Sequence, residues 1–192
     1  MAARKTREEW LGAAVTALRP RFKAAGYAIP AKVRVSCGWP TIGAISRRNR
    51  RIGECWPATS SEGKCVEMFI SPTEAKSHSV LGTLVHELIH AVLPNAGHGP
   101  KFKRAMAALG LIGKATATNE GAELKREIAV VVKELGKYPH SPIKLSHRDT
   151  KPQSTRLLKV ECPECGYVVR TTQKWIDTGF PTCPCGSEME PR

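Results

Sequence analysis

Apolar residues recur at helical spacing in four segments of the chain, each bounded by residues that start or stop helices. The first helix is expected to begin at Thr6, where Glu9 completes a capping box, and to end near Gly26. Three further helices are predicted, with Gly, Pro or Asn at their ends, at about residues 79–93, 100–109 and 120–135.

Three short runs between the first two helices are rich in residues that favour β-strands. They read KVRVSCGW, RIGECW and CVEMFIS, at residues 32–39, 51–56 and 65–71. Turn-rich segments separate the runs. We therefore expect a small antiparallel sheet packed with helices, which is an α+β fold.

The helix at 79–93 is apolar around most of its circumference and carries one polar stripe. At about 100° per residue, its aliphatic residues fill one continuous arc, and Thr83, His86, Glu87 and His90 share the remainder. Because His86 and His90 lie one turn apart, both rings can reach one metal ion, as in the HExxH motif of zinc proteases. A chance HELIH on a buried helix is the alternative interpretation.

A third histidine follows this helix at a turn. Pro94 cannot continue the helix, and the glycines on both sides of His98 free its backbone, so His98 could return to the same metal. Glu120 is the competing third ligand, because some zincins take a glutamate from a later helix. Three imidazoles leave a fourth tetrahedral position for water, which is typical of a catalytic zinc site. Glu87 would then take the proton from that water and pass it to the leaving amine.

Four of the seven cysteines form two close pairs near the C-terminus. Cys162 and Cys165 are spaced Cys-x-x-Cys, and after 17 intervening residues Cys183 and Cys185 follow as Cys-x-Cys. This arrangement predicts a zinc ribbon, in which four thiolates bind a structural zinc ion and leave no position for water. The short second pair is unusual, which makes Cys185 the least typical ligand. A redox-active dithiol is the alternative.

The segment before the cysteines contains three prolines and little periodicity. We expect an N-terminal domain at 1–137, a linker at 138–155 and a zinc ribbon at 156–192. The histidines outside the metal motif lie in polar, turn-like segments and are expected on the surface: His78, His140 and His147.

The stretch HELIHAVLPNAGHGPKFKRAM, followed by a cysteine ribbon, resembles the SprT-like (Spartan-type) zinc metallopeptidases. The similarity covers about residues 65–110 and 160–186. It implies a zincin-like fold, a catalytic zinc bound by His86, His90 and His98, and Glu87 as the base. It also implies that an edge strand pairs with an extended peptide substrate, and CVEMFIS is the candidate strand.

Positive charge is concentrated in the larger, N-terminal part of the chain. The net charge is +13, and residues 1–155 hold 25 basic and 12 acidic residues, whereas the rest is balanced. Such a field favours polyanions, and DNA is the expected partner. The candidate contacts are the arginines of RRNRR, with three helpers near the metal motif: Arg47, Arg48, Arg50 and Arg51, then Lys101, Lys103 and Arg104. A solvated charged loop is the alternative.

No segment is apolar enough for a membrane span, and the N-terminus lacks the apolar core of a secretion signal. We expect a cytoplasmic, monomeric protein with no membrane partner, whose cysteines bind metal in a reducing compartment. The expected function is that of a zinc metalloendopeptidase acting on DNA-associated proteins, with one catalytic and one structural Zn²⁺. The alternative is a zinc protein that binds DNA or a transcription complex and has weak or no peptidase activity.

Overall fold

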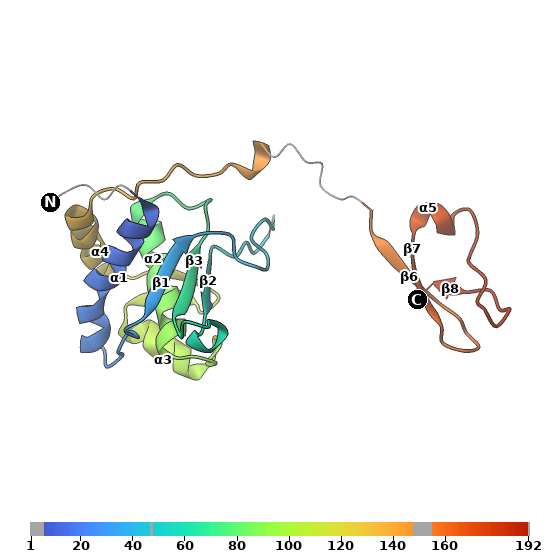
Figure 1. Cartoon of the computed structure of the whole chain (residues 1–192), viewed down its shortest axis with the longest axis horizontal. Coiled ribbons are helices and arrows are strands. Elements are labelled where there is room, and N and C mark those ends of the chain that lie inside the picture. The colour runs from blue at the N-terminus through green and yellow to red at the C-terminus, as the bar shows by residue number, and fades with distance from the viewer. Residues whose placement is uncertain (1–5, 47, 148–154, 192) are drawn as a thin grey trace. The chain divides into compact units, whose positions relative to one another are not determined.

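A computed structural model describes residues 6–46, 48–147 and 155–191 of the chain. The chain divides into two compact units, residues 1–147 and 148–192. The first unit is an α+β domain, and the second is a small β-rich module (Figure 1). Within the described ranges, every helix is too short or too polar to span a lipid bilayer.

Three strands form the main sheet of the first unit. They are β1 (Val33–Cys37), β2 (Gly53–Trp56) and β3 (Val66–Ile70), in the order β1-β3-β2. β3 pairs antiparallel with β2 but parallel with β1, so the prediction of an antiparallel sheet is wrong for one pair. After β1 the chain forms β2 at the opposite edge of the sheet, and it then returns to form β3 between the two. Because β3 runs antiparallel to β2, it runs parallel to β1.

The central place of β3 also corrects the predicted substrate strand. CVEMFIS contains β3, whose two edges are both hydrogen-bonded to neighbouring strands, so it cannot accept a peptide. β2 is an edge strand of this sheet and packs against α2 (Ser77–Val92). The strand that offers a free edge beside the HExxH helix is therefore β2.

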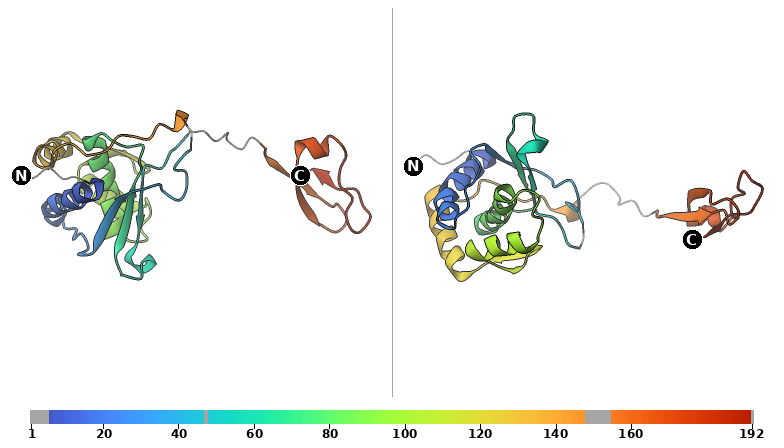
Figure 2. Two further views of the ribbon diagram at one scale, coloured as in Figure 1. Left: turned by 45° about the horizontal axis from the view of Figure 1, so that its top comes forward. Right: turned by 90° about the horizontal axis from the view of Figure 1, so that it is seen from below.

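Helices cover one side of the sheet, as the views in Figures 1 and 2 show. α1 (Arg7–Ala24) packs on β1, and its predicted capping box at Thr6 is present. α2 packs on β2 and β3, and α4 (Ala122–Leu135) packs on α1 and α2. Most of the apolar arc predicted for α2 is fully buried, at Val80, Leu81, Leu84, Val85, Leu88 and Ile89, whereas Val92 and Leu93 at its end are half-buried. Burial of this arc fixes the rotation of α2 and hence the direction of its polar stripe.

A β-hairpin lies between α3 (Pro100–Ala108) and α4 and was not predicted. Its strands are β4 (Leu111–Lys114) and β5 (Ala117–Glu120), which pair antiparallel. Most of their residues are exposed, so the hairpin has no apolar alternation that a sequence pattern could reveal.

Part of the segment predicted as a linker packs on the first unit. Tyr138 is buried, and its ring centroid lies 5.1 Å from that of Trp10. Nε2 of His140 lies 2.8 Å from the carbonyl oxygen of Pro72, so this histidine is structural and not a free surface residue. Two short 3₁₀ helices, Ala58–Ser60 and Leu145–His147, complete the unit.

The second unit consists of a three-stranded sheet and one helical turn. Its strands are β6 (Leu157–Glu161), β7 (Val168–Thr172) and β8 (Glu190–Pro191), in the order β7-β6-β8, and α5 (Gln173–Ile176) follows β7. The buried core is very small and includes two cysteines, with Val160, Met189, Cys162 and Cys183 as its members. So few buried side chains cannot stabilise a module of this size alone, and a bound metal would supply the missing stability.

Candidate metal centres

The three histidines of the sequence motif meet at one point. His86 and His90 project from α2 and His98 comes from the following turn, and each offers a ring nitrogen within 4.8 Å of the other two. Nε2 of His98 lies 3.3 Å from Nε2 of His86. This group could hold one metal ion, as the spacing predicted.

The chain returns to α2 because of its turn and the helix that follows. α2 ends at Val92, before Pro94, and Gly97 adopts a φ of 51°, a value that favours glycine. α3 then begins at Pro100 and buries Phe102 completely. The Phe102 ring centroid lies 4.6 to 5.0 Å from the centroids of all three imidazoles. Phe102 thus packs against all three imidazoles and keeps them close together. No sequence pattern indicated this role.

One imidazole is oriented by the hairpin. Nδ1 of His86 lies 3.0 Å from Oγ1 of Thr118 on β5. When Nδ1–H donates to this hydroxyl, the lone pair of Nε2 faces the other histidines. The role of Thr118 could not be predicted from the sequence, because the hairpin that carries it was not predicted.

The environment keeps the three imidazoles neutral. Burial, followed by the charges of His90 and His98, lowers the pKa of His86 to about 3. Burial, followed by the charges of His98 and Arg51, lowers the pKa of His90 to about 4. Burial and Arg51 also lower the pKa of His98. Metal binding requires neutral imidazole, so the site is ready for a cation near neutral pH.

Glu87 follows His86 on α2 and lies in a nearly closed environment. The residue is only 5% exposed. Burial raises the pKa of its carboxyl group to about 8, and the positive charge of Arg51 opposes this rise. Gly53 of β2 packs directly on it: a Cβ at Gly53 would lie 2.9 Å from the carboxyl carbon of Glu87 and 2.7 Å from Cγ2 of Thr83. The absence of a side chain at Gly53 therefore makes room for the carboxylate.

The competing ligand, Glu120, is the last residue of β5 and contacts α2 away from the histidines. Its carboxylate packs over Gly82, one turn before His86, and it is not a member of the histidine group. β5 thus directs Thr118 to His86 and Glu120 to the preceding turn. The structure brings His98, and not Glu120, to the pair on α2.

A buried carboxylate organises the loop between β1 and β2. Glu54 accepts hydrogen bonds from the backbone N–H of Thr41 at 2.9 Å and its hydroxyl at 2.7 Å, from Trp56 Nε1 at 3.1 Å and from Arg51 Nη1 at 2.9 Å. Burial alone would raise the pKa of Glu54, but these hydrogen bonds lower it below its ordinary value. The sequence analysis gave Glu54 no role.

The structure separates the arginines of RRNRR. Arg48, Arg50 and Arg51 are all exposed, but Arg51 pairs with Glu54, whereas Arg50 Nε donates to the carbonyl oxygen of Ser46. Arg47 lies outside the described residues. The predicted helpers are exposed on α3, which buries Phe102 on its other side: Lys101, Lys103 and Arg104.

The four C-terminal cysteines converge in the second unit. Their sulfur atoms all lie within 4.8 Å of one another. The Sγ atoms of Cys162 and Cys185 are 3.5 Å apart, and those of Cys165 and Cys183 are 3.4 Å apart. Cys185 therefore belongs to the group despite its unusual spacing, and the four thiols could hold a metal ion.

Two glycine turns shape this second group. The N–H of Gly166 donates to the carbonyl oxygen of Cys162, and that of Gly186 to the carbonyl oxygen of Cys183; both glycines have positive φ. Hydrogen bonding from the backbone of Ser187 lowers the pKa of Cys185 to about 6. A glycine thus closes each turn in a conformation that other residues rarely adopt.

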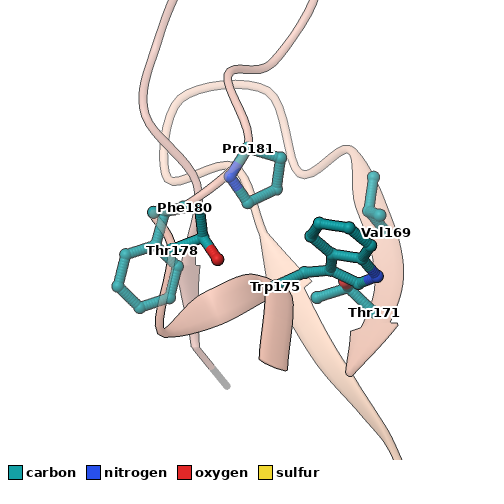
Figure 3. A pocket seen from close by; sticks show the side chains of 7 residues that line it. Val169, Thr171, Trp175, Thr178, Phe180 and Pro181 are labelled. Atoms are coloured by element: carbon teal, nitrogen blue, oxygen red, sulfur yellow. The ribbon is translucent and has the colours of Figure 1, made fainter. Parts of the chain in front are cut away.

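A shallow pocket lies beside α5 in the same unit (Figure 3). Trp175, 58% exposed, lies near Val169, Thr171 and Pro181, and Lys174 Nζ is 4.9 Å from the centroid of its ring. None of the residues that line the pocket is acidic, basic or a metal ligand. It offers a surface but no group for acid–base or metal chemistry.

Comparison of the chain with protein-family models, curated proteins and solved structures gave no significant match. The resemblance to SprT-like metallopeptidases rests on the sequence motifs alone.

Proposed function

We propose that the chain is a zinc-dependent endopeptidase of the SprT-like type. The observation that carries this proposal is the meeting of His86, His90 and His98, with ring nitrogens within 4.8 Å of one another, together with the buried carboxylate of Glu87, the residue after His86 on α2. A scaffold site needs only ligands, whereas a carboxylate next to the ligands can also move protons.

The donor set fits zinc. Three neutral imidazoles at mutual distances that one ion can bridge, one of them oriented by Thr118, match a zinc site with an open fourth position. The four cysteines match a closed structural zinc site. When bound at the histidines, zinc would supply an acidic water and polarise the substrate carbonyl.

The residues of the chain divide the remaining chemistry. Glu87 takes a proton from the attacking water and later delivers it to the leaving nitrogen. In the metal-free chain, burial raises the pKa of this carboxyl group to about 8. Phe102 and the apolar arc of α2 exclude bulk water behind the histidines.

The substrate would bind along β2. β2 is an edge strand, and its Gly53 lies against Glu87. An extended peptide that pairs with the free edge of β2 would therefore pass the carboxylate, with affinity supplied by main-chain hydrogen bonds. This mode accepts many sequences, as an endopeptidase with broad specificity requires.

Protein substrates held on DNA suit the charge distribution. Residues 1–155 carry the whole net charge of +13. Exposed cations lie on α3, the helix that also carries Phe102, and in the loop before β2. A polyanion attracted to these residues would bring its bound proteins close to the histidines.

The proposal is tested by incubating the zinc-loaded chain with an unfolded protein and identifying the fragments by mass spectrometry. We expect internal cleavage that stops on chelation, resumes when zinc is restored, and is absent in His90→Ala. The control His78→Ala removes an exposed histidine outside the cluster and should keep full activity. A zinc-loaded chain that cleaves nothing while it still binds DNA would favour the alternative, a zinc-containing binding protein.

A further inference from the structure

The loop between β1 and β2 delivers one arginine to the candidate site. The backbone N–H of Arg51 donates to the carbonyl oxygen of Gly43 at 3.2 Å, and two residues later Gly53 lies against the carboxylate of Glu87. Arg51 is therefore anchored by its backbone next to the point where β2 meets α2.

The guanidinium of Arg51 is fixed by one hydrogen bond and is otherwise partly exposed. Its Nη1 donates to Glu54 at 2.9 Å, and Glu54 is itself fixed by Thr41 and Trp56. The Arg51 side chain is still 49% exposed. A guanidinium has five N–H donors, so donors remain for a ligand after the contact with Glu54.

The charge of Arg51 acts on the site itself. It helps to lower the pKa values of His90 and His98, and it opposes the effect of burial on Glu87. Among the described residues, Arg51 is the one cation that acts on all three of these groups. An arginine that served only nucleic acid would need neither this position nor a buried carboxylate to orient it.

Peptide hydrolysis needs a partner for the charge that develops on the carbonyl oxygen. Water attacks the carbonyl carbon, its proton passes to Glu87, and the electron pair of the C=O bond moves onto oxygen. The electron pair on oxygen then re-forms the C=O bond as the C–N bond breaks. The pair of the C–N bond stays on nitrogen, which takes the proton from Glu87. Preorganised donors at the developing oxyanion are a large part of catalysis in such reactions.

We propose that Arg51, oriented by Glu54, donates a hydrogen bond to the carbonyl oxygen of the peptide bond that is cleaved and stabilises its negative charge. Arg51 is then a catalytic residue and Glu54 a positioning residue. This inference rests on the proposed peptidase function and adds to it the group that neither the metal motif nor the ribbon supplies.

The test compares Arg51→Gln and Arg51→Lys with the control Arg126→Gln, which changes an exposed arginine on α4 that has no role in the proposed site. Loss of one oxyanion donor costs about 10²- to 10³-fold in kcat, so Arg51→Gln should lose that much while KM changes by less than about threefold. Arg51→Lys keeps the charge and can still pair with Glu54, and it should recover part of the rate. Arg126→Gln should equal the wild type.

Two further readouts separate catalysis from folding and metal binding. Arg51→Gln should retain its zinc, and it should bind a phosphinic peptide, which mimics the tetrahedral state, more weakly by the same factor as its loss in kcat/KM. Glu54→Gln should lower kcat in the same direction and by less. An Arg51→Gln protein with wild-type kcat, or one whose loss of rate follows loss of zinc, would overturn the role of Arg51. A wild type that neither cleaves peptides nor binds the phosphinic peptide would overturn the proposed function and this role with it.

Discussion

At the scale of single residues, the hydrogen bond between His86 Nδ1 and Thr118 Oγ1 connects a candidate metal ligand to the β4–β5 hairpin. Thr118→Val removes the acceptor for Nδ1 and leaves the volume nearly unchanged. Loss of such an outer hydrogen bond typically weakens metal affinity by about 10- to 100-fold, and we expect a loss in this range at the histidine site. Competition with a zinc chelator would measure it. Thr116→Val, on the exposed turn of the same hairpin, should leave the affinity unchanged.

Glu87 makes the stability of the metal-free protein depend on pH. Burial raises its pKa from 4.5 to about 8, so the folded state binds the proton more tightly than the unfolded state. The stabilisation from this proton is complete below the unfolded pKa and is lost as the pH rises through the folded one. Glu87→Gln lacks this loss.

Chemical unfolding in the presence of a chelator, at pH values from about 5 to about 8, would show the effect. Wild type should lose stability relative to Glu87→Gln as the pH rises, and the buried histidines contribute equally to both proteins. Glu123→Gln, an exposed carboxylate in the first turn of α4, should track the wild type. A constant difference between wild type and Glu87→Gln would show that the carboxylate is not held in an apolar environment.

The sequence was sufficient for the metal ligands because their chemistry restricts residue type and spacing. HExxH, the glycines around His98 and the cysteine pairs each brought their residues together as expected. It was insufficient for Thr118, Phe102, Glu54 and the position of Arg51. These residues act through tertiary contacts, and a threonine, phenylalanine, glutamate or arginine has many other uses that a single sequence cannot distinguish.

At the scale of elements, the contact between β2 and α2 determines whether Glu87 can lie beside the histidines. A Cβ at Gly53 would approach Thr83 and the carboxyl group of Glu87 more closely than atoms allow. Gly53→Ala should therefore displace Glu87 or β2 and reduce peptide hydrolysis strongly, with little change in zinc content because the three imidazoles are untouched. Gly12→Ala is the matched control, since a Cβ there meets no atom within 4 Å. Equal activity of the two variants would contradict the proposed packing of β2 on the base.

The elements themselves were predictable to different degrees. The helices followed from apolar spacing, and the Thr6 capping box marked the start of α1. Strand positions followed from composition, but strand direction did not, because it depends on the crossover that puts β3 between β1 and β2. The β4–β5 hairpin escaped prediction because its strands are short and most of their residues are exposed, so they show no alternation of apolar and polar positions.

At the scale of the whole molecule, the excess of positive charge lies in residues 1–155 and not in the C-terminal region. The region from 156 onward holds as many acidic as basic residues, and four thiolates with one Zn²⁺ would make it negative. Exposed cations lie in the first unit, including Arg48, Arg50 and Lys103. Affinity for DNA should therefore depend on the first unit.

Binding titrations at two salt concentrations would test this division. A chain of residues 1–155 should keep most of its affinity for DNA, and the double variant Arg48→Gln, Arg50→Gln should bind more weakly with a shallower dependence on salt. Arg51 is left intact in this variant, so its role at the site does not enter the comparison. Loss of binding on removal of the ribbon, with no effect of the arginine changes, would place the DNA contact in the second unit.

The most direct measurement of the central claim is the rate of peptide hydrolysis by zinc-loaded wild type and Glu87→Gln at equal zinc content. Glutamine keeps the size of the side chain and all three imidazoles but cannot take a proton from water. We predict a loss of at least about 100-fold in kcat, with an unchanged zinc content and intact folding. A Glu87→Gln protein that cleaves at a rate near that of the wild type would contradict the assignment of Glu87 as the base and, with it, the proposed mechanism.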